Sequence, residues 1–296
     1  MFILGTDWWT DCDDAVAVRL LCRAAKKGEI ALGAIGLNAC TEGSVESLDG
    51  FVQEEGMGGV PIGVDLAATD FHGTPVYQKA IRKYAKRFSA NEQAEDAVRL
   101  YRRVLAEAQE KVEIIEIGFM QVLVGVLESG ADEFSPRNGM ELVREKVKKV
   151  WIMAGKWDGE GESEHNFNNN ARARVAAEKL CRLCPAPITF LDWEIGHDVI
   201  TGKELKDGDV LKELMCVHGS PKGRMSWDPM TALMAIIGDE EEAGYDVVRG
   251  FARVDALTGA NYFTRDENGP HAFVVKKWEN ERYERMIEER IASENG

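Results

Sequence analysis

Short apolar runs alternate with longer amphipathic segments along the first two thirds of the chain. The short runs are bounded by glycine and polar residues, which is typical of buried strands in a parallel sheet. The amphipathic segments place apolar residues three and four positions apart, which predicts helices that bury one face. The predicted strands are the segments "MFILG", "IALGAIGLN", "VEIIEIGF", "VKKVWIMAG" and "PITFLDW".

Helices are predicted between these strands. The first, "DDAVAVRLLCRAAKKG", places Val18, Leu21, Cys22 and Ala25 on one face and stops at Gly28. The others are 42–55, 90–110, "MQVLVGVLES" and 169–183. This alternation of strand and helix predicts an α/β fold, a doubly wound, mostly parallel sheet flanked by helices.

The C-terminal third has a different pattern. "WDPMTALMAIIG" and "ENERYERMIEERIA" predict helices, whereas "YDVVRGFARVDAL" and "HAFVVKKW" predict strands that are antiparallel and near a sheet edge. The stretch 155–170 is too polar and too rich in glycine for a regular element, so we expect a loop there. Because no low-complexity linker and no internal repeat interrupts the chain, residues 1–296 are expected to form one domain.

Charge and composition narrow the classes of function. The 296 residues are 45% hydrophobic, and the formal net charge of -15 argues against nucleic acids and anionic membranes as partners. No stretch approaches the roughly 20 apolar residues of a membrane span, and no signal peptide is visible. A cytoplasmic protein that binds a small molecule is therefore expected. The six scattered cysteines, including the CxxC of Cys181 and Cys184, are expected to be reduced structural thiols.

The segment "GTDWWTDCDDAVAV" concentrates acids where the first strand meets the first helix. Asp7, Asp11, Asp13 and Asp14 fall within it. One or two carboxylates are explained as helix caps, but four would raise one another's pKa unless a cation neutralised them. Carboxylate oxygens select Ca²⁺ or Mg²⁺. We therefore predict a divalent metal at the carboxyl edge of the sheet, where ligands bind in such folds.

The same segment resembles the N-terminal signature of the nucleoside hydrolases, the inosine/uridine-preferring family of N-ribosyl hydrolases. That signature is a strand ending in DxD, a short loop, and DDA opening a helix. Two departures are visible here. Gly5 replaces the first acid, and the loop "WWTDC" is longer than the commonest form and supplies Asp11.

Four further segments resemble the family, each at a predicted strand end or helix start. They are "AIGLNA" with Asn38, "IEIGFMQVL" with Gln121, "ESEHNFNNNARAR" with Glu164 and Asn166, and "SWDPMTAL" with Asp228. Each match is weak alone, but five matches in the family's order over residues 5–233 are specific.

The resemblance implies a hydrolase that cleaves the N-glycosidic bond of ribonucleosides with a Ca²⁺-bound water. Such a reaction passes through an oxocarbenium-like state at the sugar. The family's tendency to form homo-dimers and homo-tetramers is expected here too. The residue roles that the resemblance implies are calcium ligation by Asp7, Asp14, Asp228 and the Gln121 carbonyl, proton acceptance by Asp7 or Asp11, and contacts to ribose from Asp13, Asn38, Glu164 and Asn166.

Aromatic residues and histidines bear on the leaving group. Trp227 stands where many family members carry a histidine thought to protonate the leaving base. Trp8, Trp9 and Trp227 could stack on a flat leaving group or belong to the core. Trp8 and Trp9 are not both expected in the core, because neighbours in an extended segment point to opposite sides. His72 and His165 are alternative acids or ordinary polar residues.

Two rival functions come from other classes. One is a metal-dependent ribose- or nucleoside-binding protein without efficient turnover. The other is a metal-dependent phosphatase, since a strand ending near DxD also resembles haloacid-dehalogenase-type phosphatases, although Gly5 occupies the place of their nucleophile. No P-loop or GxGxxG follows the first strand, so the sequence does not support binding of nucleoside triphosphates or NAD.

Overall fold

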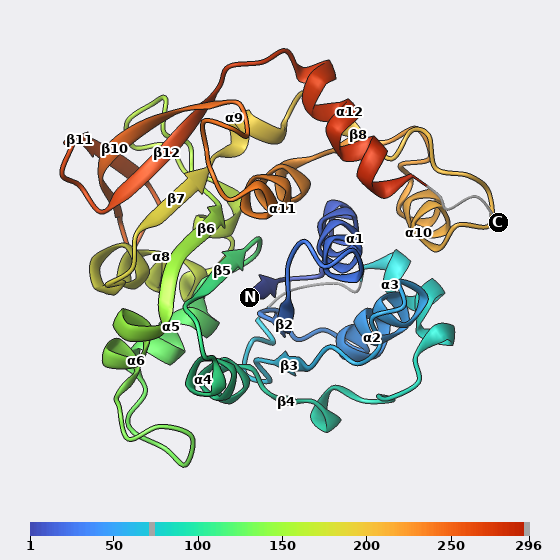
Figure 1. Cartoon of the computed structure of the whole chain (residues 1–296), viewed down its shortest axis with the longest axis horizontal. Helices are drawn as coiled ribbons and strands as arrows, with labels where there is room; N and C mark the ends of the chain where they lie inside the picture. Colours follow the sequence, from blue (N-terminus) through green and yellow to red (C-terminus); the bar gives the residue numbers. More distant parts are fainter. Residues whose placement is uncertain (71–74, 293–296) are drawn as a thin grey trace.

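Over residues 1–70 and 75–292, which the computed structural model describes, one ten-stranded sheet runs through the protein with helices on both faces (Figure 1). The strand order is β11-β10-β12-β7-β6-β5-β1-β2-β3-β4, and β8 and β9 form a separate pair. The strands span β1 Phe2–Thr6, β2 Leu32–Leu37, β3 Ile62–Val64, β4 Glu95–Asp96, β5 Val112–Glu116, β6 Val147–Met153, β7 Ile188–Leu191, β8 Ile200–Thr201, β9 Arg224–Met225, β10 Tyr245–Val254, β11 Asn261–Arg265 and β12 His271–Lys276.

Helices cover the two faces of this sheet in separate groups. Helices α1, α2, α10, α11 and α12 contribute to the core on one face, and α4, α5, α6 and α8 pack on the other. The helices span α1 Asp13–Lys26, α2 Ser44–Glu54, α3 Val76–Ile81, η1 Arg82–Tyr84, η2 Asn91–Gln93, α4 Ala97–Glu107, α5 Gln121–Glu128, α6 Gly139–Lys146, α7 His165–Asn168, α8 Ala171–Leu183, α9 Trp193–Gly196, α10 Val210–His218, α11 Trp227–Ile237 and α12 Asn280–Ile291.

Strand directions confirm the predicted fold class. From β12 through β7, β6, β5, β1, β2 and β3 to β4, neighbouring strands pair in parallel. Only at the other edge does β10 run antiparallel to both β11 and β12. Helical crossovers between parallel strands place the carboxyl ends of the central strands at one edge of the sheet. The first strand lies near the middle of the sheet, so the acidic loop that follows it opens at this edge.

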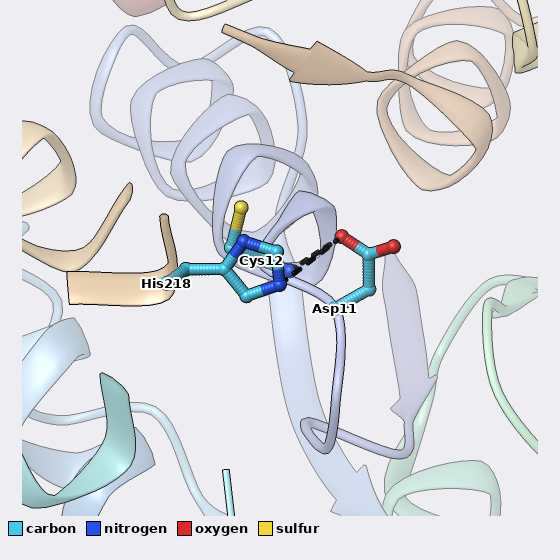
Figure 2. Close-up of side chains that lie close together, drawn as sticks. All are labelled: Asp11, Cys12 and His218. Atoms are coloured by element: carbon cyan, nitrogen blue, oxygen red, sulfur yellow. Dashed lines mark hydrogen bonds and ion pairs between the residues drawn. The ribbon is translucent and has the colours of Figure 1, made fainter. Parts of the chain in front are cut away.

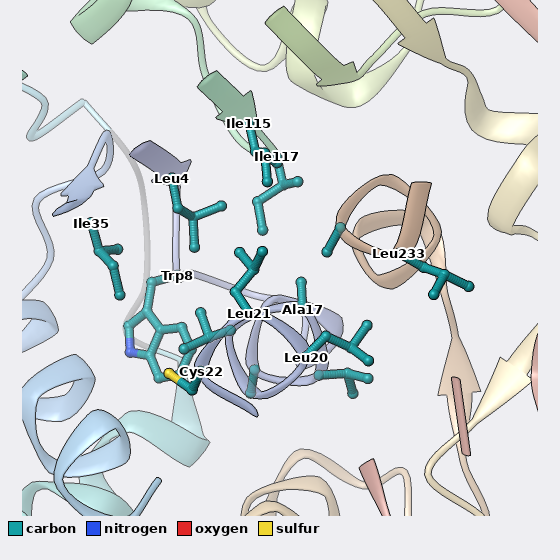
Figure 3. Packing of buried hydrophobic residues seen from close by; sticks show 14 of the residues in the cluster. Leu4, Trp8, Ala17, Leu20, Leu21, Cys22, Ile35, Ile115, Ile117 and Leu233 are labelled. Carbon is teal, nitrogen blue, oxygen red and sulfur yellow. The ribbon is translucent and has the colours of Figure 1, made fainter. Parts of the chain in front are cut away.

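Among the described residues, the two large hydrophobic cores lie on the two faces of the sheet, and a small third cluster contains Trp9. Leu4, Ile35 and Ile115 face α1, whose apolar side chains pack against them (Figure 3). Residues next to them in the strands point to the opposite core, as the pleat requires. The sequence predicted too narrow an apolar face for α1. Arg19 is also buried, because Glu55 and Asp209 each accept a hydrogen bond of 2.7 Å from its guanidinium.

A buried acid lies beneath the acidic loop. Glu116 of β5 pairs in register with Gly5 of β1, and a Cβ atom on residue 5 would lie 1.8 Å from its Oε2 atom. The glycine therefore makes room for this carboxyl group. Burial raises the pKa of Glu116 to about 8, so the group is mostly protonated at neutral pH.

Two predicted segments differ from the structure. The predicted helix 90–110 is split, and α4 begins only at Ala97, because the Asp96 side chain accepts a hydrogen bond of 2.9 Å from Arg99 N and caps the helix there. The predicted loop 155–170 contains the short helix α7, whose first N–H groups are capped by Glu164. Both errors arise from side-chain caps in polar segments.

The thiols and the helix lengths agree with the sequence analysis. All six cysteines are free, and Cys181 and Cys184 lie at the end of α8 and just beyond it. Within the described ranges 1–70 and 75–292, no helix has the length and apolar character that a bilayer crossing requires.

Candidate active site

A cavity of about 200 Å³ opens at the carboxyl edge of the sheet. Its walls come from the loop between β1 and α1, from the start of α7, and from the first residues of α9 and α11. This is the position that the strand directions predict for a ligand in a doubly wound sheet. The acidic loop and the later matching segments therefore meet in one place.

Three carboxylates form the tightest group in this cavity. One oxygen from each of Asp13, Asp14 and Asp228 lies within 4.8 Å of the others, and all three residues are buried. Asp14 accepts hydrogen bonds from the Thr6 hydroxyl and from Trp8 N. Asp228 N donates to Asp13 Oδ2 at 3.1 Å. The bond from Asp228 N joins the N-terminus of α11 to that of α1, and the bonds from Thr6 and Trp8 fix the Asp14 side chain.

Burial and mutual repulsion make this group unfavourable without a cation. Burial, followed by the charge of Asp13, raises the pKa of Asp7 to about 7. Burial and neighbouring carboxylates likewise hold the pKa of Asp13, Asp14 and Asp228 well above the usual range. Among the described residues that line the cavity, none is a lysine or an arginine. The donor set therefore fits a divalent metal ion that prefers oxygen ligands.

Asp11 has different partners from the other acids of the loop. Arg224 Nε lies 2.9 Å and Nη2 2.5 Å from its two carboxylate oxygens. His218 Nε2 lies 3.9 Å from Asp11 Oδ1 beside the Cys12 side chain (Figure 2). Burial raises the pKa of the Cys12 thiol, so this thiol stays protonated. Sequence reasoning missed Arg224 and His218, because no pattern in the chain links them to a loop about two hundred positions away.

Glu164 and Asn166 line the cavity, as the resemblance implies. The Glu164 carboxylate accepts hydrogen bonds from Asn166 N at 2.9 Å and from Gly155 N at 3.1 Å. Burial still raises its pKa to about 7. Asn166 Nδ2 donates to Met153 O at 2.9 Å. Backbone groups at the end of β6 and in the loop that follows it therefore hold both side chains in place.

Asn38 and Gln121 lie beside the cavity rather than in its wall. Gln121 Nε2 donates to Asn38 O, and Asn38 Oδ1 accepts from Phe119 N at 3.0 Å. Asn38 Nδ2 is buried and has no hydrogen-bond partner within residues 1–70 and 75–292. Contact of Asn38 with ribose and of the Gln121 carbonyl with calcium stay predictions.

Both tryptophans of the acidic loop are buried, which corrects the expectation that one of them would lie outside the core. Trp8 is fully buried and donates from Nε1 to Ser47 Oγ at 2.9 Å, while Trp9 is 7% exposed. The reason is that the loop is not extended at Trp8, whose φ is 47°, and that protein covers the loop on both sides. This backbone turn also directs Trp9 N toward Asp7 Oδ1 at 3.3 Å.

Aromatic residues form another part of the cavity wall. Trp227 lines the cavity, and its Nε1 donates to Trp193 O at 2.8 Å. Trp193 lines the cavity too, although the sequence analysis treated it only as the last residue of a predicted strand. The two indole centroids are 6.4 Å apart.

His165 also reaches the cavity, whereas His72 lies outside the described residues. The His165 ring lies 6.1 Å from the Trp9 ring and 6.0 Å from that of Phe119, between centroids. Its Nε2 lies 3.1 Å from Asn169 Nδ2. Burial lowers the pKa of His165, so the ring is mostly neutral at pH 7.

No sequence model of a protein family matches the chain, and a search of curated protein sequences finds no match. Solved structures are similar over 98% of the chain. A plant nucleoside hydrolase has a TM-score of 0.73 at 17% identity, with 98% of its own chain covered. A purine-preferring ribonucleoside hydrolase from Gardnerella vaginalis also reaches 0.73 at 17% identity, with 97% covered. An inosine-uridine preferring nucleoside hydrolase from Bacillus anthracis reaches 0.67 at 14% identity, with 98% covered. The protein therefore has the fold of the nucleoside hydrolases.

Proposed function

We propose that the protein hydrolyses the N-glycosidic bond of ribonucleosides to ribose and a free base, with calcium as its metal. The observation that carries the proposal is the cavity itself. It brings the buried acids Asp13, Asp14 and Asp228 together with Glu164 and Asn166 at the carboxyl edge of a nucleoside hydrolase fold. The sequence pattern alone predicts a role in metal or ribose binding for each of these residues.

Asp7, Asp14 and Asp228, with the Gln121 carbonyl, are the proposed calcium ligands, and the proximity of Asp13 to Asp14 and Asp228 supports it as a further ligand in addition to its proposed contact with ribose. Bound calcium would lower the pKa of a water molecule and polarise sugar hydroxyls. The acids fit such an ion because they are buried, mutually repulsive and fixed by backbone N–H groups.

Asp7 is the better candidate for the group that accepts the proton of the attacking water. Asp11, the alternative, accepts hydrogen bonds from Arg224 Nε and Nη2, which occupy both of its oxygens. Asp7 lines the cavity, and its Oδ1 accepts a long hydrogen bond of 3.3 Å from Trp9 N. We therefore assign two roles to Asp11: it fixes the conformation of the loop, and it neutralises the charge of Arg224.

Recognition of ribose is assigned to Glu164, Asn166 and Asp13, with Asn38 behind them. Carboxylate and amide oxygens accept hydrogen bonds from sugar hydroxyls, and the backbone holds Glu164 and Asn166 in position. Departure of the base has no dedicated acid among the described cavity residues. The Trp227 N–H already donates to Trp193 O, and His165 is mostly neutral.

The test is release of free ribose from a panel of nucleosides, measured with calcium and again with a chelator. We expect ribose release that the chelator abolishes. Release of inorganic phosphate from phosphorylated substrates instead would favour a phosphatase. Calorimetric binding of ribose without any release would favour a binding protein. Analytical ultracentrifugation of the same sample tests the proposed homo-dimer or homo-tetramer.

A further inference from the structure

The cavity is rich in carboxyl groups, which a bound cation would keep ionised. Six carboxyl groups line it within the described ranges, namely Asp7, Asp11, Asp13, Asp14, Glu164 and Asp228. Arg224 offsets one of these charges, and a divalent cation would offset two. His165 adds little positive charge, because burial lowers its pKa. A cationic group in this cavity would therefore gain Coulomb energy that a neutral group of the same shape would not.

The aromatic part of the cavity wall also favours a positively charged group. Trp193 and Trp227 already hold cations at their rings, since Lys156 Nζ lies 4.6 Å from the Trp193 centroid and the Arg224 guanidinium carbon 5.5 Å from that of Trp227. Neither cation lines the cavity, and each is paired with an acid, Lys156 with Glu162 and Arg224 with Asp11. Indole faces attract positive charge through their quadrupole.

The absence of a dedicated acid among the described cavity residues matters only for some leaving groups. A neutral purine leaves its ribose as an anion unless a proton is delivered to it, and an indole N–H does not deliver one. A heterocycle whose glycosidic nitrogen already carries a positive charge needs no proton. It takes the electron pair of the breaking bond and departs as a neutral molecule.

We propose that the preferred substrates are ribosides of a positively charged aromatic nitrogen heterocycle, with N-ribosylnicotinamide as the simplest probe. This inference rests on the proposed function. In the reaction the water oxygen bonds to C1′, the bond from C1′ to the pyridinium nitrogen breaks, and its electron pair neutralises the ring. The proton of the water passes to Asp7 and then to solvent. The products are ribose, nicotinamide and one proton.

The first experiment compares kcat/KM for N-ribosylnicotinamide and inosine on the calcium-loaded protein. We expect the cationic riboside to be cleaved at least about 100-fold faster, which is the low end of what general acid catalysis contributes. Inosine cleaved as fast as N-ribosylnicotinamide would overturn the inference while leaving the proposed function intact. Cleavage of no riboside would overturn the proposed function itself.

Two variants separate ring charge from ring shape. Trp193→Leu should lower kcat/KM for N-ribosylnicotinamide about fivefold more than for the neutral p-nitrophenyl riboside, because it removes a cation–π partner. Equal losses would contradict the inference. Trp227→His should raise the ratio of inosine to N-ribosylnicotinamide turnover, since it supplies a group that can hold a proton. An unchanged ratio would show that protonation of the base is not what limits inosine.

Binding without turnover provides an independent readout. Nicotinamide and 1-methylnicotinamide share one ring, and only the second carries a positive charge. Titrated against tryptophan fluorescence in the presence of calcium and ribose, the cation should bind at least about tenfold more tightly than the neutral amide. Equal affinities would contradict a preference for positive charge, whether or not any riboside is cleaved.

Discussion

The metal side and the aromatic side of the cavity are built in different ways. On the metal side, Asp13 and Asp14 begin α1 and Asp228 lies at the start of α11, where backbone N–H groups fix carboxylates. On the aromatic side, Trp193 and Trp227 contribute indole rings, and the indole N–H of Trp227 donates to a backbone oxygen. The first side holds charge at a fixed point, whereas the second offers a surface that tolerates rings of different shape. We infer that the metal side sets the reaction and the aromatic side sets the leaving group.

The largest expected effect comes from breaking the metal side. Asp228→Asn should weaken calcium binding more than about 100-fold, because even groups that only support a metal ligand contribute 10–100-fold, and it should abolish turnover. Isothermal titration calorimetry measures the affinity. Asp198→Asn, an identical change at a carboxylate that is 68% exposed, is the control and should change neither quantity. Unchanged calcium affinity in Asp228→Asn would contradict the assignment of the metal.

The aromatic side is tested by changing the leaving group. The p-nitrophenyl riboside departs without strong protonation, so its kcat/KM should exceed that of inosine by about 10²–10⁴-fold, the usual contribution of general acid catalysis. Steady-state kinetics at one calcium concentration measures this gap. Comparable values for the two substrates would show that another residue, His165 or His72, delivers the proton.

Asp11 lies between the two sides and should have an intermediate effect. Asp11→Ala should lower kcat/KM about tenfold, because Arg224 would lose its partner and bring a positive charge to the metal side. Arg224→Met tests the same pair from the other end. Because both side chains are partly exposed, a double-mutant cycle in urea unfolding should give a coupling of about 1 kcal/mol. No loss of activity and no loss of metal affinity in Asp11→Ala would make the residue a surface charge only.

The smallest effect on catalysis is expected at Glu116, beneath the acidic loop. Glu116 keeps its proton up to about pH 8 in the folded protein, whereas its ordinary pKa is 4.5. The folded state therefore binds more protons between these values, and this contribution to the free energy of unfolding falls as pH rises from 4.5 to 8. Glu116→Gln should remove that fall, a difference of roughly 4 kcal/mol at pH 8. Thermal unfolding with saturating calcium measures it, and an unchanged pH dependence would be the contrary result.

The sequence was most informative where local patterns determine the structure. Alternating strands and helices predicted a mostly parallel sheet, and the different pattern of the C-terminal third predicted the antiparallel edge at β10. The acids of the metal side were identified because they follow a strand or begin a helix, where short-range capping rules apply. Short elements such as β3, with three residues, carry too little periodicity to be recognised.

The aromatic side was less predictable because it depends on long-range packing. Trp193 reaches the cavity only because β7 ends beside the start of α11, and Arg224 meets Asp11 across 213 positions of the chain. Trp8 shows that packing can also override the local conformational preference of a single residue. A positive φ at a tryptophan is unfavourable on its own, and packing against Phe51 and Tyr77 and the bond to Ser47 hold it there.

The bond from Asp228 N to Asp13 Oδ2 has a consequence for biosynthesis. It spans 215 positions, so a ribosome must release more than three quarters of the chain before the two helix starts can meet. Until then, the acids of the first loop repel one another, and Asp228 has not yet joined them to complete the site. The proposed calcium ion needs both helix starts and would therefore bind only after this step, adding stability that rises with the logarithm of its concentration. The availability of the ion during synthesis would then govern how much of the protein matures.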